Sequence, residues 1–136
     1  MQGYNLVWVF NQQKDKVLMC KRHKDPYLGL YNLLGGKIEP GESGLDSAKR
    51  ELWEEAGILS IDLVHLMDLT YHLLDSCYIQ VYFGFLDGEN HGEGDEKELV
   101  WMDVAEDFFD MDRFAGEGNI GHIYQIILQN TGMAAK

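Results

Sequence analysis

The chain has 136 residues, of which 46% are hydrophobic and 12% aromatic, a composition typical of one globular domain and not of a disordered chain. Its formal net charge of −12 argues against general affinity for a nucleic-acid polymer, because such binding needs a basic surface. No apolar run reaches the length of a membrane span, and the N-terminus lacks a basic region followed by a small-residue cleavage site. We therefore expect a single cytoplasmic domain over residues 1–136 that does not contact membranes.

The first half of the chain predicts a hairpin, an irregular connection and a helix. Residues 4–10 and 17–22 are rich in aromatic and β-branched side chains, and the polar stretch between them predicts a turn. Glycine and proline in residues 23–42 predict a long irregular connection, which is where functional residues are often found. A helix is expected to begin near Ser43 and to end at Gly57, a residue type that closes helices in the left-handed conformation.

The second half predicts strands, an acidic loop and a closing helix. In chain order we expect one or two strands in 59–75, a strand in 77–87, a loop in 88–98, a strand in 99–102, a helical turn in 103–109 and a helix in 119–130. Strands lie before and after a central helix, and a second helix follows at the end. This order predicts an α+β fold, an α/β sandwich in which a mixed β-sheet lies between helices.

The central helix carries a cluster of acidic side chains. Glu51, Glu54 and Glu55 are spaced i, i+3, i+4 and therefore share one helix face. A separate apolar stripe, suited to lie on a core, consists of Leu45, Ala48, Leu52 and Ala56. Like charges at this spacing destabilise a helix, so a bound cation is the simplest compensation. Glutamate oxygens suit Mg²⁺ or Mn²⁺, which also bind phosphates, so a nucleotide remains a plausible ligand despite the negative charge.

The stretch from Gly36 to Ile58 resembles a complete Nudix box. Gly36 is followed after five residues by Glu42, and seven residues later by the run RELWEEAGI, which begins at Arg50. Every position that the motif fixes is filled, a coincidence expected by chance on the order of once in a billion windows. The resemblance implies a Nudix fold and a metal-dependent pyrophosphohydrolase that cleaves a nucleoside diphosphate linked to another group.

The resemblance also implies roles for the acidic residues of the box. Glu54 and Glu55 would be the main metal ligands, and Glu51 would be a ligand or the group that orients the attacking water. The backbone carbonyl of Gly35 would be a further ligand, and Glu42 resembles a supporting acidic residue. The sequence does not decide which phosphorus is attacked or which carboxylate is the general base.

The residues themselves suggest how this site would be supported. Arg50 is the cation in the helix best placed to hold a carboxylate in its ligating conformation by a charge-assisted hydrogen bond. Backbone amides around Gly35, Gly36 and Lys37 could cradle a phosphate, as successive N–H groups do in anion-binding loops.

Signals outside the box concern the substrate. The stretch YNLLGGKIEPGE is similar to that of MutT-like enzymes that hydrolyse oxidised purine nucleoside triphosphates. Aligned on the two glycines, Asn32 falls where some of those enzymes read the base, and Arg22 falls where they contact phosphate. An amide can offer a donor and an acceptor together to a purine edge, but an asparagine that only shapes a turn explains Asn32 equally well.

Two further regions are placed by resemblance alone. Glu96 is similar in position to a distal acidic metal ligand, although Asp95 or Glu98 could take that role and each is also explained as a solvated loop acid. Glu96 is also a third candidate, beside Glu51 and Glu54, for the general base. Residues 110–119 lie where related enzymes contact the base.

Together these features predict a Mg²⁺-dependent pyrophosphohydrolase, for which Mn²⁺ could substitute. The expected substrate is a (d)NTP or an oxidised (d)NTP such as 8-oxo-dGTP, cleaved to a nucleoside monophosphate and pyrophosphate. Alternatives are hydrolysis of ADP-ribose or a dinucleoside polyphosphate, or a Nudix sensor that binds a nucleotide without turnover. Degenerate sensors usually lose a metal carboxylate, and this box has lost none. The sequence leaves open whether the chain is a monomer or a homodimer.

Overall fold

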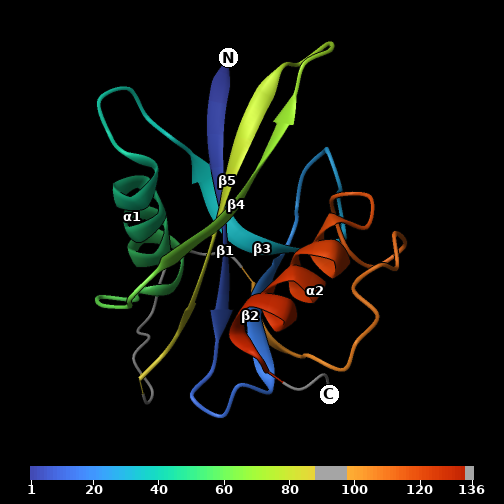
Figure 1. Ribbon diagram of the computed structural model, residues 1–136. Helices are drawn as coiled ribbons and strands as arrows, with labels where there is room; N and C mark the ends of the chain where they lie inside the picture. Colours follow the sequence, from blue (N-terminus) through green and yellow to red (C-terminus); the bar gives the residue numbers. More distant parts are fainter. Residues whose placement is uncertain (88–97, 134–136) are drawn as a thin grey trace.

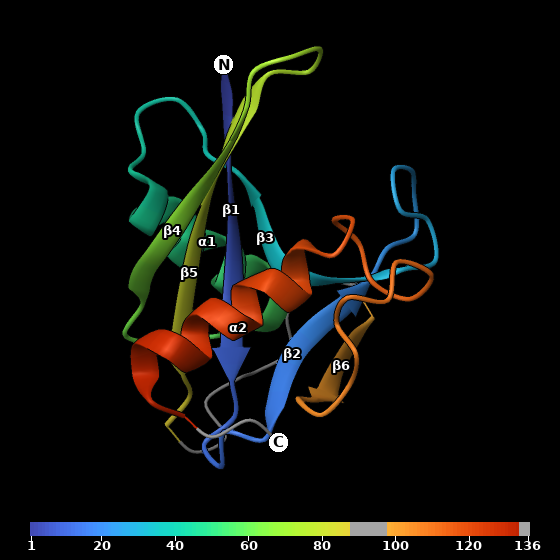
Figure 2. The ribbon, with the colours of Figure 1, turned by 45° about the vertical axis from the view of Figure 1, so that its right-hand side comes forward.

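The computed structural model describes residues 1–87 and 98–133, in which one mixed sheet lies between two helices (Figures 1 and 2). Its elements are β1 (Gln2–Phe10), β2 (Lys16–Lys21), β3 (Tyr31–Lys37), α1 (Gly44–Ala56), β4 (Val64–Tyr71), β5 (Cys77–Phe85), β6 (Leu99–Asp103) and α2 (Asn119–Thr131). The strand order is β4-β5-β1-β3-β2-β6, with β1 and β5 parallel and the other neighbours antiparallel. The expected α+β sandwich is thereby confirmed.

Strand β1 lies inside the sheet and contributes to a core on each face. Val9 packs with Leu52 of α1 on one face, whereas Trp8 packs with Ile123 of α2 on the other. A strand buried on both sides needs apolar residues at successive positions, which explains the unbroken run VWVF. None of the helices in the described part of the chain is long and apolar enough to span a membrane.

Helix α1 begins and ends where the sequence predicted. The Ser43 side chain accepts a hydrogen bond from the Asp46 amide at 3.0 Å, which is N-terminal capping. Gly57 is left-handed, with φ of 67°, and its N–H bonds back to Trp53 O. The predicted apolar stripe is correct for its later members but wrong for Leu45, which is 36% exposed. Leu45 lies in the first turn, whereas the buried residues of the helix begin at Ser47.

The buried face of α1 includes Glu55, a charged residue that we expected on a separate acidic face of the helix. Glu55 is only 2% exposed and belongs to the same buried surface as Ala48 and Leu52. On a helix with 100° per residue, Glu55 falls about 20° from Ala48, on the side of Ala48 away from Leu52. The expected separation of an acidic face from an apolar face is therefore wrong for Glu55. Its carboxylate is accommodated because the Gly35 amide donates to Oε1 at 3.0 Å.

The main error of the sequence prediction is β3, which lies within the stretch 23–42 expected to be irregular. Glycine has a low strand propensity, but here both edges of β3 are occupied, with Gly36 opposite Asn5 of β1 and Asn32 opposite Cys20 of β2. Pairing on two sides supplies the backbone hydrogen bonds that local propensity would not predict.

The remaining predictions hold except at one turn and in the predicted hairpin. The two strands of that hairpin, β1 and β2, pair only at Phe10 and Val17, and β3 lies between them in the sheet. The region 59–75 forms the single strand β4, and the strands in 77–87 and 99–102 and the final helix are confirmed within two residues. Residues 104–109 form turns rather than a helical segment, with the Glu106 amide bonded to Asp103 O at 3.2 Å. The predicted loop over 88–98 lies, apart from its last residue, outside the described residues.

Gly35 is required by its position between β1 and α1. Its φ is +148°, and a Cβ at this residue would overlap the backbone carbonyl of Asn5. We expect Gly35→Ala to lower the free energy of unfolding by about 3 kcal/mol, combining backbone strain with a steric clash. Gly41→Ala is the matched control, because Gly41 has φ of +87° with open space around it, so we expect a loss of about 1 kcal/mol. Equal losses in urea denaturation would contradict the clash.

Candidate active site

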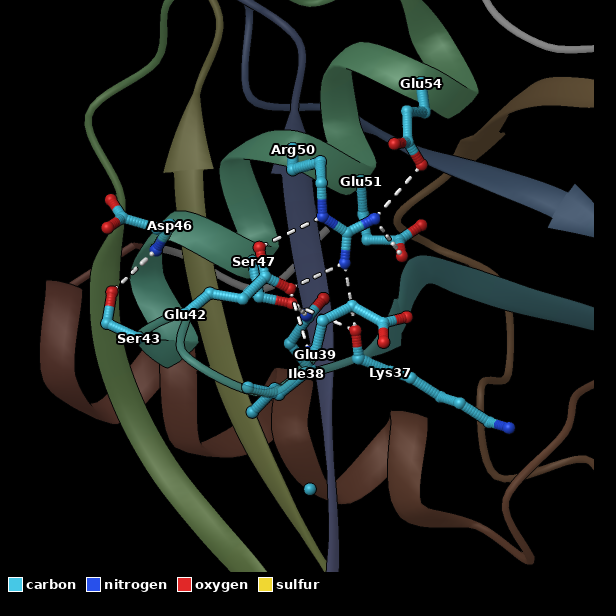
Figure 3. A network of polar contacts seen from close by, with 12 residues as sticks. Lys37, Ile38, Glu39, Glu42, Ser43, Asp46, Ser47, Arg50, Glu51 and Glu54 are labelled. Atoms are coloured by element: carbon cyan, nitrogen blue, oxygen red, sulfur yellow. Dashed lines mark hydrogen bonds and ion pairs between the residues drawn. The ribbon is translucent and has the colours of Figure 1, made fainter.

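Arg50, near the middle of α1, is hydrogen-bonded to four of the candidate residues (Figure 3). Its guanidinium donates two bonds to Glu42, from Nη2 to Oε1 at 2.7 Å and from Nε to Oε2 at 3.1 Å. Nη1 donates to Glu51 Oε1 and to Glu54 Oε2, both at 3.1 Å. Nη2 also donates to the Lys37 carbonyl at 3.1 Å. One cation thus gathers three carboxylates and the end of β3.

Glu42 fixes the loop between β3 and α1 to this cation. Besides its bidentate pair with Arg50, Glu42 Oε1 accepts the Glu39 amide at 2.9 Å. The hydrogen bonds from Arg50, followed by the one from Glu39, lower the pKa of Glu42 to about 2. Bidentate carboxylate–guanidinium pairs are among the strongest and most directional hydrogen bonds in proteins. The loop therefore has a defined position before any ligand binds.

Two buried polar residues that the sequence reasoning missed support the same carbonyl. Ser47 Oγ donates to Lys37 O at 3.1 Å and accepts from Asn5 Nδ2 at 2.9 Å. Both side chains are buried, so this chain of hydrogen bonds joins β1, α1 and the end of β3 away from water. The sequence contains a signal for Asn5, because this polar residue interrupts the apolar run YNLVWVF.

The three glutamates of the cluster differ in their surroundings. Glu55 is buried against Gly35, the side chain of Glu51 is 14% exposed, and that of Glu54 is 49% exposed. A Cβ on Gly36 would lie 2.5 Å from Glu51 Oε1, so this glycine leaves the space that the carboxylate occupies. The cluster runs from the helix–sheet interface to solvent.

The electrostatics of Glu51 indicate unbalanced negative charge. Burial raises its pKa, and the nearby charge of Glu55 raises it further, whereas Arg50 acts in the opposite direction. Closely spaced, partly buried oxygens of this kind are suitable ligands for a hard divalent cation. Among the residues that the structure describes, no three acidic, histidine or cysteine side chains converge closely enough to enclose a metal ion. Glu51 and Glu54 are turned towards Arg50, and Glu55 is turned towards Gly35.

The residues expected to contact substrate fall at two ends of β3. Gly36 and Lys37 lie at the Arg50 end, where the Lys37 side chain points away from the network (Figure 3). Asn32 lies at the start of the strand, and its Oδ1 accepts the Leu33 amide at 2.8 Å. Arg22 follows β2, and its Nε donates to Pro26 O at 2.7 Å. Neither Asn32 nor Arg22 belongs to the Arg50 network.

The segment 110–119 lies beside the start of β3, next to Asn32. The Tyr31 amide donates to Arg113 O at 2.8 Å, and the Ala115 amide donates to Tyr31 O at 2.9 Å. The alternative distal acid Glu98 is exposed, and its carbonyl accepts the Lys21 amide at 3.2 Å. Asp95 and Glu96 lie outside the described residues, so the distal ligand stays a prediction.

Comparison with known proteins identifies relatives over most of the chain. A family model, the NUDIX domain, matches residues 3–118. The uncharacterized Nudix hydrolase YvcI of Bacillus subtilis is 33% identical over 129 residues, which is 90% of this chain and 77% of that protein. The oxidized purine nucleoside triphosphate hydrolase of Mus musculus is 32% identical over 105 residues, which is 74% of this chain and 65% of that protein.

A solved structure supports the same relationship at the level of the fold. The structure described for MutT from Aliivibrio salmonicida and Vibrio cholerae superposes with a TM-score of 0.72 at 20% identity. The match covers 94% of this chain and 97% of the other. At this identity the likeness establishes the shared fold alone.

The Glu42–Arg50 pair predicts how stability depends on pH. Folding lowers the pKa of Glu42 from 4.5 to about 2, so its carboxylate stabilises the fold above pH 4.5, and this contribution is lost as the pH falls towards 2. We expect Glu42→Gln to unfold at lower urea concentration than the wild type at pH 7, with the difference shrinking between pH 4.5 and 2. Glu39→Gln, an exposed acid of the same loop, is the control. A difference that does not vary with pH would contradict the assignment.

Proposed function

The chain belongs to the Nudix family of hydrolases, whose members act on pyrophosphate bonds, and we propose that it converts a nucleoside triphosphate to a nucleoside monophosphate and pyrophosphate. We propose Mg²⁺ as its cofactor, within a family that generally uses divalent metal ions. The observation that carries this proposal is the hydrogen bonding of Arg50 to Glu42, Glu51 and Glu54 beside the glycine-containing end of β3. The box is thus complete both in sequence and in its supporting contacts.

Each part of the cluster has a proposed role. Glu51, Glu54 and Glu55 would hold the cation together with the Gly35 carbonyl, and Glu51 and Glu54 would first have to leave Arg50. When bound, a divalent cation supplies positive charge to the diphosphate oxygens and lowers the pKa of water. Glu42 and the Lys37 carbonyl keep Arg50 in place while those carboxylates move.

The reaction itself is a displacement at phosphorus. A water oxygen bonds to one phosphorus of the α–β anhydride, the bridging P–O bond to that phosphorus breaks, and the products are nucleoside monophosphate and pyrophosphate. We assign the water's proton to Glu51, which packs against Gly36 where the phosphates are expected. Burial raises the pKa of Glu51, and a higher pKa makes a carboxylate a stronger proton acceptor. The backbone amides of Gly36 and Lys37 orient the phosphates from the other side.

For the nucleoside, we propose an oxidised purine such as the base of 8-oxo-dGTP. Asn32 and the segment 110–119 lie together at the start of β3, away from the Arg50 network. Asn32 Oδ1 already accepts the Leu33 amide, which orients the side chain and leaves Nδ2 as a donor for the base. The mouse relative, named for oxidized purine nucleoside triphosphates, supports this choice.

The metal carboxylates are tested by measuring turnover with Mg²⁺ on a panel containing 8-oxo-dGTP, dGTP, ADP-ribose and diadenosine polyphosphates. Release of nucleoside monophosphate reports on every member of the panel, and release of pyrophosphate reports on the triphosphates. We expect Glu54→Gln and Glu55→Gln each to reduce kcat by about 100-fold or more, since both remove a cation ligand. EDTA should abolish turnover, and added Mg²⁺ should restore it. Asp46→Asn, an exposed acid of the first turn of the same helix, should keep wild-type activity.

The panel can also reject the proposal. No turnover of any nucleotide by the wild type, or full activity in both glutamine variants, would exclude this mechanism. Tight nucleotide binding without turnover in calorimetry would instead indicate a sensor. Fastest turnover of ADP-ribose or of a dinucleoside polyphosphate would keep the mechanism and change the substrate.

Base recognition by Asn32 predicts a selective kinetic defect. Asn32→Ala should raise KM for the guanine or 8-oxoguanine nucleotide by about tenfold, because one hydrogen bond to the base is lost. KM for nucleotides with other bases should change much less, and kcat should stay within about twofold. Steady-state kinetics on the same panel measures both parameters. An equal rise in KM for all nucleotides would assign Asn32 to loop structure.

A further inference from the structure

Two loops that are distant in sequence are joined by a side-chain hydrogen bond at the start of β3. Tyr27, in the loop between β2 and β3, donates its hydroxyl to Glu117 Oε1 at 2.8 Å, across 90 residues of sequence. Asn119 Nδ2 donates to the Tyr71 hydroxyl at 2.9 Å and ties the β4 end to the same region. In Figure 2 the loop around residues 22–30 and the segment around 110–118 lie side by side at the right.

Both partners of the Tyr27–Glu117 bond have an unfavourable backbone conformation. Tyr27 has φ of 69° and Glu117 has φ of 53°, the left-handed region that favours glycine. Gly116 and Gly118, on either side of Glu117, are also left-handed, with φ of 88°. Glycine or asparagine at positions 27 and 117 would adopt this backbone conformation at a lower energetic cost. The side chains retained at these strained positions indicate a role for their contact.

The hydrogen bond is a charge-assisted one over the whole physiological pH range. Partial burial and the bond to Glu117 raise the pKa of Tyr27 to about 12, so the phenol remains protonated and donates. Its acceptor is a carboxylate, and such bonds are stronger than those between neutral groups.

The segment held by this bond is also paired with the strand that carries Asn32. Tyr31 exchanges two backbone hydrogen bonds with residues 113 and 115, at 2.8 and 2.9 Å. From Tyr31 to Lys37 the strand has seven residues, which corresponds to roughly 20 Å along β3. The Tyr27–Glu117 bond therefore lies at the opposite end of β3 from the Arg50 network and does not touch the groups assigned to the chemistry.

We propose that Tyr27 and Glu117 are positioning residues for base recognition. Their hydrogen bond holds the β2–β3 loop against residues 113–118 and so fixes the surface next to Asn32 on which the base is read. This role rests on the proposed function. It makes discrimination between bases depend on a contact at the opposite end of β3 from the groups assigned to the phosphates.

The kinetic test compares Tyr27→Phe and Glu117→Gln with the wild type. The measured quantity is the ratio of kcat/KM for the preferred nucleotide to that for a nucleotide with another base. We expect this ratio to fall about tenfold in each variant, the effect of one charge-assisted hydrogen bond, while kcat stays within about twofold. Tyr124→Phe is the matched control, because this α2 tyrosine is buried and its hydroxyl has no hydrogen-bond partner among the described residues.

A second measurement does not depend on turnover. Hydrogen–deuterium exchange of the Tyr31 and Ala115 amides reports the pairing of β3 with the held segment. We expect about tenfold faster exchange of both amides in Tyr27→Phe and Glu117→Gln, and no change in Tyr124→Phe. Unchanged exchange in the first two variants would overturn the positioning role.

The outcomes separate this inference from the function on which it rests. Absence of turnover of every nucleotide by the wild type overturns the proposed function and the base-reading role with it. Turnover without base preference, or equal losses for all nucleotides in both variants, overturns the positioning role alone. A selective loss with unchanged kcat and faster amide exchange supports it.

Discussion

The site depends on a carboxylate buried where α1 meets β3. Glu55 lies in the middle of the helix surface that contacts the sheet, and an acidic side chain can remain there only with a hydrogen-bond donor. The Gly35 amide is that donor, and it reaches Glu55 because the chain at Gly35 passes against the Asn5 carbonyl without a side chain. Gly36 next to it leaves room for Glu51. The two glycines allow helix and strand to approach closely, and this approach brings the Lys37 carbonyl at the end of β3 to Arg50.

Burial explains why the pKa values of Glu42 and Glu51 shift in opposite directions although both carboxylates are bonded to Arg50. Glu42 accepts two bonds from Arg50 and one from a backbone amide, and its pKa falls. Glu51 accepts one bond from Arg50 but is partly buried beside Glu55, and its pKa rises. Hydrogen bonding to the charged form dominates at Glu42, whereas loss of hydration and like-charge repulsion dominate at Glu51. A single cation can thus anchor one acid as a structural group and leave another suited to accept a proton.

Strand β3 connects two regions with different tasks. Its last residue is held by Arg50 and Ser47 at the helix, and its first residue is paired with the segment before α2. The Arg50 network and the region around Asn32 therefore lie at opposite ends of one strand. This arrangement is consistent with a family defined by the pyrophosphate bond rather than by one nucleoside.

The sequence alone determined the features whose signals are local. The capping serine and closing glycine of α1, the box itself and the final helix each depend on residues within a few positions of one another, so their physical cause can be read from the chain. Tertiary structure decided the features whose partners are distant. Asn5 meets Ser47 across 42 residues and Tyr27 meets Glu117 across 90, and β3 is a strand because β1 and β2 pair with both of its edges. The packing of α1 buried Glu55, because helical spacing shows which residues share a face but not how wide a face packs against the sheet. Leu45 is exposed because the first turn of the helix lies outside that contact.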